Sequence, residues 1–210
     1  MSGYFTNDDI VAMEKRRRTA FINSLSGFKS VSLIGTVAAS GQSNLSIFSS
    51  VTHLGSNPAL IGIVSRPGGR HSLQNILETG CFTINHIHPA VVKQAHQTSA
   101  RYAPEVSEFD ATGLTPEYHA LLPAPYVSES VIKYGLSLVE SHELKINGTT
   151  LVIGKVVEVF VPPACLLADG TIDLEAAATI TSAGLDSYHT TSRITRLTYA
   201  KPNQLPQDMP

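Results

Sequence analysis

The sequence predicts a mainly β fold, a barrel of six or more strands with only short helices between them. The clearest signal is a hairpin in which Leu136–Ile146 and Thr149–Val161 form two long strands joined by Asn147-Gly148, a dipeptide typical of tight turns. The stretch from Ser30 to Ser65 contains no Asp, Glu, Lys or Arg, and its β-branched and apolar runs are separated by turn-forming residues. We therefore expect a sheet that begins early in the chain and has no helical crossovers.

The elements are expected in a simple order along one domain. Asn7 or Asp8 can cap an N-terminal helix, in which apolar residues such as Ile10 and Phe21 recur at helical intervals. We assign residues 1–28 to this helical extension, 29–200 to the domain and 201–210 to a loose tail. The expected strands are 29–38, 44–52, 59–64, 82–88, 136–146, 149–161 and, closing the sheet, 192–199.

Composition narrows the class of protein further. A chain of 210 residues with 42% hydrophobic and 15% charged residues can bury a core of its own. Its formal charge of -2 does not suit a nucleic-acid binder, and the early acidic residues, including Asp8 and Glu14, do not suit a signal peptide. Glycine, asparagine and proline interrupt the uncharged stretch too often for a membrane helix, and Cys81 and Cys165 form no C-x-x-C pair. We expect a cytoplasmic protein with reduced thiols, no membrane span and a small-molecule ligand.

Two neighbouring regions predict a site for an anionic ligand. The segment from Thr36 to Thr52 is dense in neutral Ser, Thr and Asn donors, which suit a phosphorylated polyol. The strand that follows ends at Arg66, and after Arg70 a short helix opens at Ser72. Guanidinium groups and the free amides of a helix N-terminus together favour a phosphate.

The sequence gives weaker evidence for nucleotide-binding motifs, a metal site or a hydrolase. Neither a G-x-G-x-x-G nor a G-x-x-x-x-G-K-[ST] motif follows a strand. His86 and His88 could be two metal ligands, but no nearby carboxylate completes a set, so structural histidines are favoured. Ser187 and His189 suggest a hydrolase, yet no nucleophile elbow surrounds the serine. We predict neither a metal site nor a catalytic acid/base pair.

Several segments, in this order and spacing, resemble the flavin reductase-like FMN-binding split-barrel family. The match covers most of residues 30–199 and is densest over 43–85. Two departures affect one loop: Ala59 stands where relatives often have a second proline, and the stretch 54–56 lengthens the loop before it. The segments that carry the resemblance are 44–52, 57–60, Arg66-Pro67, Ser72, Asn75-Ile76, 79–85, 107–109, Gly113-Leu114, 184–189, Arg196-Leu197 and Tyr199.

The resemblance implies a homodimeric, six-stranded antiparallel Greek-key split barrel with a few peripheral helices, in which FMN lies near the subunit interface. It implies that backbone groups of four residues line the isoalloxazine edge, that two serines bind the ribityl chain or phosphate, that an arginine and a serine complete the phosphate site, and that a tyrosine or the next histidine closes over the ring. In that order these are Asn44, Leu45, Ser46 and Ile47; Ser49 and Ser50; Arg66 and Ser72; and Tyr188 or His189.

The reaction implied by the resemblance is reduction of flavin, or of a further acceptor, by NAD(P)H through hydride transfer to flavin N5, which needs no side-chain base. One alternative is an FMN-binding electron carrier without fast nicotinamide turnover. Another is a flavin oxidase resembling pyridoxamine-phosphate oxidase. That oxidase would need several cations over the flavin, whereas between Lys133 and Arg193 the chain has only Lys145 and Lys155.

Overall fold

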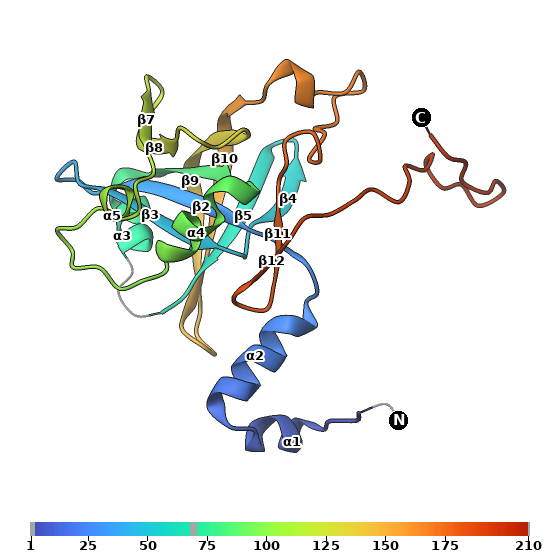
Figure 1. Ribbon diagram of the computed structural model, residues 1–210, viewed down its shortest axis with the longest axis horizontal. Coiled ribbons are helices and arrows are strands. Elements are labelled where there is room, and N and C mark those ends of the chain that lie inside the picture. Colours follow the sequence, from blue (N-terminus) through green and yellow to red (C-terminus); the bar gives the residue numbers. More distant parts are fainter. Residues whose placement is uncertain (1–2, 68–70, 210) are drawn as a thin grey trace.

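The computed structural model describes residues 3–67 and 71–209, and its centre is one antiparallel sheet (Figure 1). The strand order is β3-β2-β6-β9-β10-β5-β4, so the main sheet has seven strands where the family resemblance implied six. The additional strand is β4, which pairs with β5 at the edge of the sheet. The strands are β2 (Ser32–Val37), β3 (Ser43–Phe48), β4 (Thr52–Ser56), β5 (Ala59–Ser65), β6 (Cys81–His86), β9 (Lys133–Leu144) and β10 (Thr149–Phe160).

The sheet curls so that its two ends meet. Just beyond β3, Ser50 Oγ donates to the carbonyl oxygen of Val64 on β5 and accepts from its N–H, both at 3.1 Å. Leu33 and Ile34 on β2 belong to different hydrophobic clusters on opposite faces of the sheet. Because both faces of the sheet are covered, consecutive residues in its strands are apolar, and apolar and polar residues do not simply alternate.

Short helices and a second hairpin cover the barrel. Helix α3 buries Ile76 in the cluster that also contains Phe82, while Phe109 of α5 packs in the other cluster. These elements are α3 (His71–Thr79), η1 (Pro89–Val91), α4 (Val92–Gln97), α5 (Glu108–Thr112), β7 (Pro116–His119), β8 (Leu122–Val127) and η2 (Pro163–Cys165). No helix among the described residues is long and apolar enough to cross a membrane.

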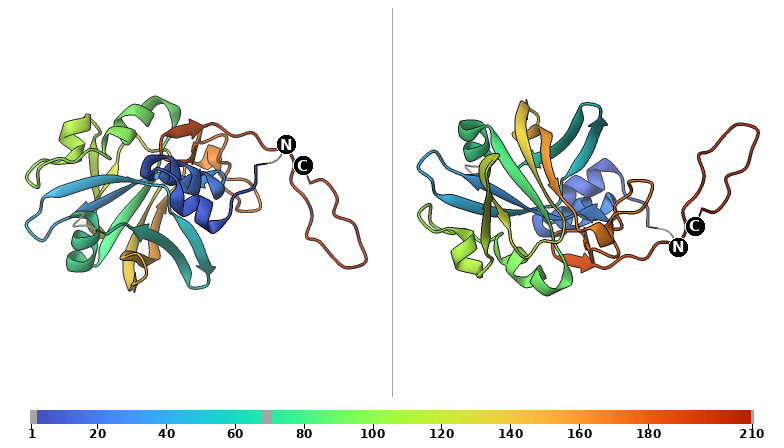
Figure 2. Two further views of the ribbon diagram at one scale, coloured as in Figure 1. Left: turned by 90° about the horizontal axis from the view of Figure 1, so that it is seen from below. Right: turned by 90° about the horizontal axis from the view of Figure 1, so that it is seen from above.

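A small separate sheet pairs the segment just after helix α2 (Lys15–Leu25) with two strands near residues 181–189. It consists of β1 (Lys29–Ser30), β11 (Thr181–Ala183) and β12 (Ser187–His189), in the order β1-β11-β12. The closing strand predicted at 192–199 is wrong, since the last strand ends at His189. Beyond it the chain leaves the barrel (Figures 1 and 2), and Leu197 forms only an isolated bridge with Asp208 of the same segment.

The N-terminal extension forms two helices where one was predicted. Helix α1 (Asn7–Ala12) is capped by Thr6, not by Asn7 or Asp8, and helix α2 (Lys15–Leu25) is capped by Glu14. The Glu14 carboxylate accepts two backbone N–H groups at 2.9 and 3.0 Å, which starts a new helix and ends the earlier one. Neither helix has a buried residue, and both project from the barrel (Figure 1).

Candidate functional site

A cavity of about 610 Å³ lies where the barrel, the small sheet and helices α2 and α4 meet. Its volume falls in the range of small-molecule and cofactor sites. Five of the residues predicted for the site line it: Ile47, Ser49, Ser50, Arg66 and Tyr188. The structure adds further lining residues that the sequence did not indicate, among them Lys29, His96, Ser99, Thr149, Ser182 and Gly184.

Two cations give the cavity a positive potential. Lys29 Nζ donates to the carbonyl oxygens of Asn23 at 3.2 Å and Gly184 at 2.9 Å, so its charge is held in place without a carboxylate. Burial, followed by repulsion from Arg66, lowers the pKa of Lys29. None of the described residues lining the cavity is Asp or Glu. Two cations that repel each other and lack a carboxylate partner favour an anionic ligand.

Hydroxyl groups lie in the same cavity. Ser182 is 4% exposed, and its Oγ has no hydrogen-bond partner among the described residues. A buried hydroxyl without a partner is costly, which indicates a polar ligand beside it. Ser49 and Thr149 also line the cavity, so neutral donors accompany the two cations.

An aromatic pair forms another part of the wall. The Tyr188 hydroxyl on β12 and Nδ1 of His96 on α4 are 2.7 Å apart, and their rings meet edge to face with centroids 5.7 Å apart. Burial, with a smaller contribution from the Asp186 charge, raises the pKa of Tyr188, which keeps the phenol protonated. Together with Ile47 and Val31, the pair offers a surface for a flat ring.

Four of the predicted site residues do not line this cavity. Asn44, Leu45 and Ser46 on β3, and Ser72 on α3, are buried inside the protein. A hydrogen bond of 3.0 Å joins Ser72 Oγ to Ser46 Oγ, which ties α3 to β3. The geometry therefore gives Ser72 an internal role and does not bring it together with Arg66. Arg70 lies outside the described residues.

A buried carboxylate completes this internal network. Glu108 on α5 accepts the backbone N–H of Leu45 at 3.0 Å. The Asn44 amide satisfies its neighbours best when Nδ2 donates to Glu108 Oε2 at 3.2 Å and Oδ1 accepts from Ser72 Oγ at 2.9 Å. Burial raises the pKa of Glu108 despite these hydrogen bonds. These polar residues hold β3 between two helices, so their side chains are used in the fold.

The histidines considered as metal ligands bind groups of the protein itself. His86 Nδ1 lies 3.1 Å from Thr179 Oγ1, and burial lowers the pKa of His86 to about 4. His88 Nε2 lies 3.0 Å from the carbonyl oxygen of Glu129. Within residues 3–67 and 71–209 there is no group of three potential metal ligands.

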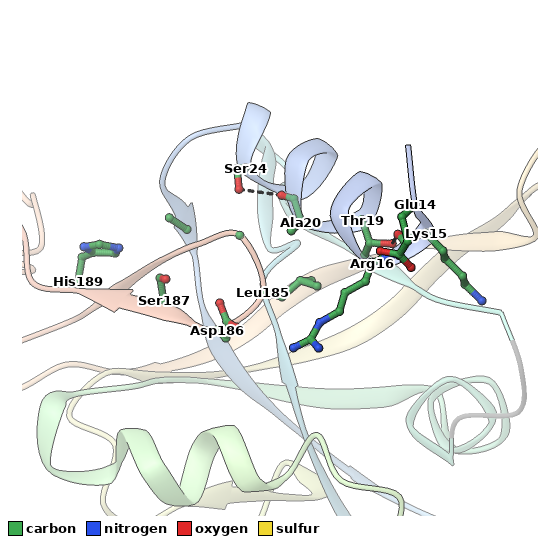
Figure 3. A pocket seen from close by; sticks show the side chains of 12 residues that line it. Glu14, Lys15, Arg16, Thr19, Ala20, Ser24, Leu185, Asp186, Ser187 and His189 are labelled. Atoms are coloured by element: carbon green, nitrogen blue, oxygen red, sulfur yellow. Dashed lines mark hydrogen bonds between the residues drawn. The ribbon is translucent and has the colours of Figure 1, made fainter. Parts of the chain in front are cut away.

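A second cavity, of about 480 Å³, lies between helix α2 and the turn that joins β11 to β12 (Figure 3). Helix α2 forms one wall through Arg16 and Ala20, and Leu185 and His189 belong to the opposite wall. Its wall and that of the first cavity share Gly184 and Leu185. Ser187 also lines this cavity. No hydrogen bond joins Ser187 to His189 in the described chain, so the structure does not support the hypothesis of a Ser-His hydrolase.

The fold and the first cavity together define a split-barrel protein whose cavity is lined by two cations and several hydroxyl groups. The family model of the flavin reductase like domain matches residues 26–171, and the chain belongs to this family. A split-barrel protein from Shewanella frigidimarina NCIMB 400, assigned as a flavin reductase, superposes with a TM-score of 0.92 at 52% identity. The alignment covers 95% of this chain and 100% of that protein.

More distant relatives share parts of the chain. Flavoredoxin of Desulfovibrio vulgaris is 25% identical, with a TM-score of 0.71, over 84% of this chain and 92% of its own. The uncharacterized protein YwrF of Bacillus subtilis is 27% identical over 135 residues, which cover 60% of this chain and 65% of YwrF. An uncharacterized protein of Aquifex aeolicus is 27% identical over 109 residues, 50% of this chain and 56% of the relative. The chain thus spans less than two thirds of these two curated relatives.

Proposed function

We propose that this protein is an FMN-binding oxidoreductase that takes electrons from NAD(P)H and passes them to free flavin or to another acceptor. The observation that carries the proposal is the character of the 610 Å³ cavity, which combines two cations, several hydroxyls and an aromatic wall with no acidic residue in its described lining. The Shewanella protein, 52% identical and assigned as a flavin reductase, supports this function.

The residues present fit a flavin mononucleotide. Lys29 and Arg66 would hold the phosphate, and the unpaired hydroxyl of Ser182 would gain a partner from the ligand. Tyr188 and Ile47 would contact the flat ring system. A backbone role for Asn44, Leu45 and Ser46 beside the ring stays a prediction.

A bound flavin would supply the redox chemistry, since its N5 accepts hydride from a reduced nicotinamide. The residues of this chain provide binding and orientation. Lys29, fixed by two backbone carbonyl groups, neutralises negative charge without moving. The hydrogen bond between His96 and Tyr188 holds α4 and β12 together and keeps that wall in place. No acid/base side chain is needed for hydride transfer.

We also infer a homodimer with the cavity near the subunit interface, in the cytoplasm. Helix α2 contributes Ile22 and Asn23 to the cavity, yet no residue of the helix is buried in one chain. A second copy covering α2 would protect that side of the site from water. The two cysteines are buried and unpaired, which suits a reducing compartment.

Anaerobic reduction tests the proposed activity. We expect the protein loaded with FMN to lose its visible flavin absorbance within seconds of adding NADH or NADPH, since oxidoreductases commonly turn over at about 1–1000 per second. Free FMN with the same nicotinamide is the control. If the flavin stays bound and oxidised with both donors, the protein is not an NAD(P)H-dependent reductase. The alternative, an FMN-binding electron carrier without nicotinamide turnover, would then be favoured.

A further inference from the structure

The C-terminal arm, residues 191–209, exposes apolar side chains that a stable protein normally covers. Ile194 is 99% exposed, Tyr199 90% and Leu205 86%. Figures 1 and 2 show the arm, in red, running away from the barrel. Apolar residues exposed together on one projecting segment mark an interaction surface.

The arm is nevertheless shaped by its own hydrogen bonds. Thr198 N–H donates to the carbonyl oxygen of Gln207 at 2.9 Å, and Met209 N–H donates to that of Arg196 at 2.8 Å. An isolated pair of extended segments is at best marginally stable in water. A surface outside this chain would therefore have to stabilise the arm.

Ion pairs tie the root of the arm to the segment that follows η2. Arg196 pairs with Asp169, and Arg193 lies 3.7 Å from Asp173. Both carboxylates belong to the segment after η2, whereas the second cavity is formed by α2 and the turn between β11 and β12. The arm is thus directed outward.

The second cavity has the complementary properties (Figure 3). It is open and offers apolar surface at Ala20 and Leu185. His189 Nε2 is buried and has no hydrogen-bond partner among the described residues. The lining carries both signs of charge, with Lys15 and Arg16 beside Glu14 and Asp186. In the part of the chain that the structure describes, neither Asp186 nor Lys201 on the arm forms an ion pair, so Asp186 is the carboxylate that Lys201 could meet.

We propose that the arm of each copy lies in the second cavity of a second copy. This builds on the homodimer proposed above and goes beyond it by naming the contact. Every chain has one arm and one second cavity. In a dimer with two-fold symmetry, each arm can therefore fill the cavity of the other chain, and no arm or cavity is left to bind a third copy. A partner of another kind would have no such reason to match the cavity and arm of this chain.

In this arrangement the arm of the second copy also lies beside the proposed flavin site. Gly184 and Leu185 belong to the walls of both cavities. A seated arm would hold this turn from one side while the ligand contacts it from the other. The dimer and the flavin cavity would then be coupled through one short turn.

Substitutions in the arm test the contact by sedimentation equilibrium of the full chain. Because Ile194 and Tyr199 are almost fully exposed in one chain, Ile194→Asp and Tyr199→Asp should leave the fold intact. We expect each to raise the dimer dissociation constant at least about tenfold. Leu121→Asp, at a 65% exposed residue in the β7–β8 turn, is the control and should not change it. Unchanged dimerisation of the arm variants, an equal loss in the control or a monomeric wild type would each overturn the proposal.

Mixing two single variants locates the contact independently of flavin. We expect a short bismaleimide to join Ala20→Cys in one chain to Tyr199→Cys in another and to give a species of twice the mass. The native Cys81 and Cys165 are buried, so neither variant alone should react in this way. No joined species in the mixture would contradict the arm exchange. FMN binding is measured separately, so loss of binding with intact cross-linking would refute the proposed function and leave this contact standing.

Discussion

Replacing Gly35 with alanine is expected to destabilise the barrel by at least about 3 kcal/mol, the cost of forcing an atom into a packed core and breaking a buried hydrogen bond. A Cβ at this position on β2 would overlap the carbonyl oxygen of Pro125 on β8 and lie 2.5 Å from Thr83 Oγ1 on β6. Thr83 Oγ1 already donates to that carbonyl oxygen at 2.6 Å. The three strands therefore approach one another only because position 35 has no side chain.

Gly62→Ala is the matched control for this substitution. Gly62 is also inside a strand, but a Cβ there would meet only side-chain atoms of Leu54, Leu151 and Thr52, at 3.0 to 3.3 Å. We expect the free energy of unfolding, measured with urea, to change by less than about 1 kcal/mol in Gly62→Ala. Equal stability of the Gly35→Ala protein and the wild type would show that β8 does not pack on β2 as described.

Removing both cations of the cavity should have the largest effect on binding. Each charge-assisted contact contributes about 1–3 kcal/mol, so we expect Arg66→Ala to weaken FMN binding by that amount and the double variant with Lys29→Ala by about 30-fold to 25,000-fold. Arg66 forms no ion pair in the described chain, so its removal should change stability little. Lys29→Ala also removes the hydrogen bonds to Asn23 and Gly184 and should lower the free energy of unfolding by about 1–3 kcal/mol.

Arg17→Ala provides the control for a lost charge. Arg17 is exposed on α2 and lines neither cavity. Fluorescence titration with FMN should give the wild-type affinity for this variant. FMN affinity that is the same in the double variant as in Arg17→Ala would remove Lys29 and Arg66 from the phosphate site.

Local signals in the sequence predicted the long hairpin well. The observed strands, Lys133–Leu144 and Thr149–Phe160, lie close to the predicted ranges. The turn itself differs from the prediction, because the loop spans residues 145–148 and only Gly148 of the Asn147-Gly148 pair has a positive φ, at +69°. The helix expected from Ser72 is α3, and Gly80 just beyond it has φ +71°. These features depend on neighbouring residues, which is why the sequence alone reveals them.

Features that join distant segments were missed. The bond from Lys29 to Gly184 spans 155 residues, and the contact from His96 to Tyr188 spans 92, so no local pattern places these side chains in one cavity. The wrong strand at 192–199 has a similar cause. Its alternation of side chains is real, but only the fold shows that this segment pairs with residue 208 of the arm and not with the sheet.

The sequence predicted only part of the candidate site, because it does not show which distant segments cover a given strand. Ile47 and Ser49 reach the cavity, whereas Asn44 and Ser46 on the same strand are buried in a network with Ser72. A polar residue on a strand suggests a ligand when one face is open. Here helices α3 and α5 cover that part of β3, and the sequence does not show which polar residues are enclosed.

The central claim is that the 610 Å³ cavity binds a flavin through its phosphate. The most direct test compares the affinity of the wild-type protein for FMN and for riboflavin, which lacks the phosphate, by calorimetric titration at one salt concentration. With Lys29 and Arg66 both contacting the phosphate, FMN should bind at least about 30-fold more tightly. Equal affinity for the two flavins, or no binding of either, would contradict the account.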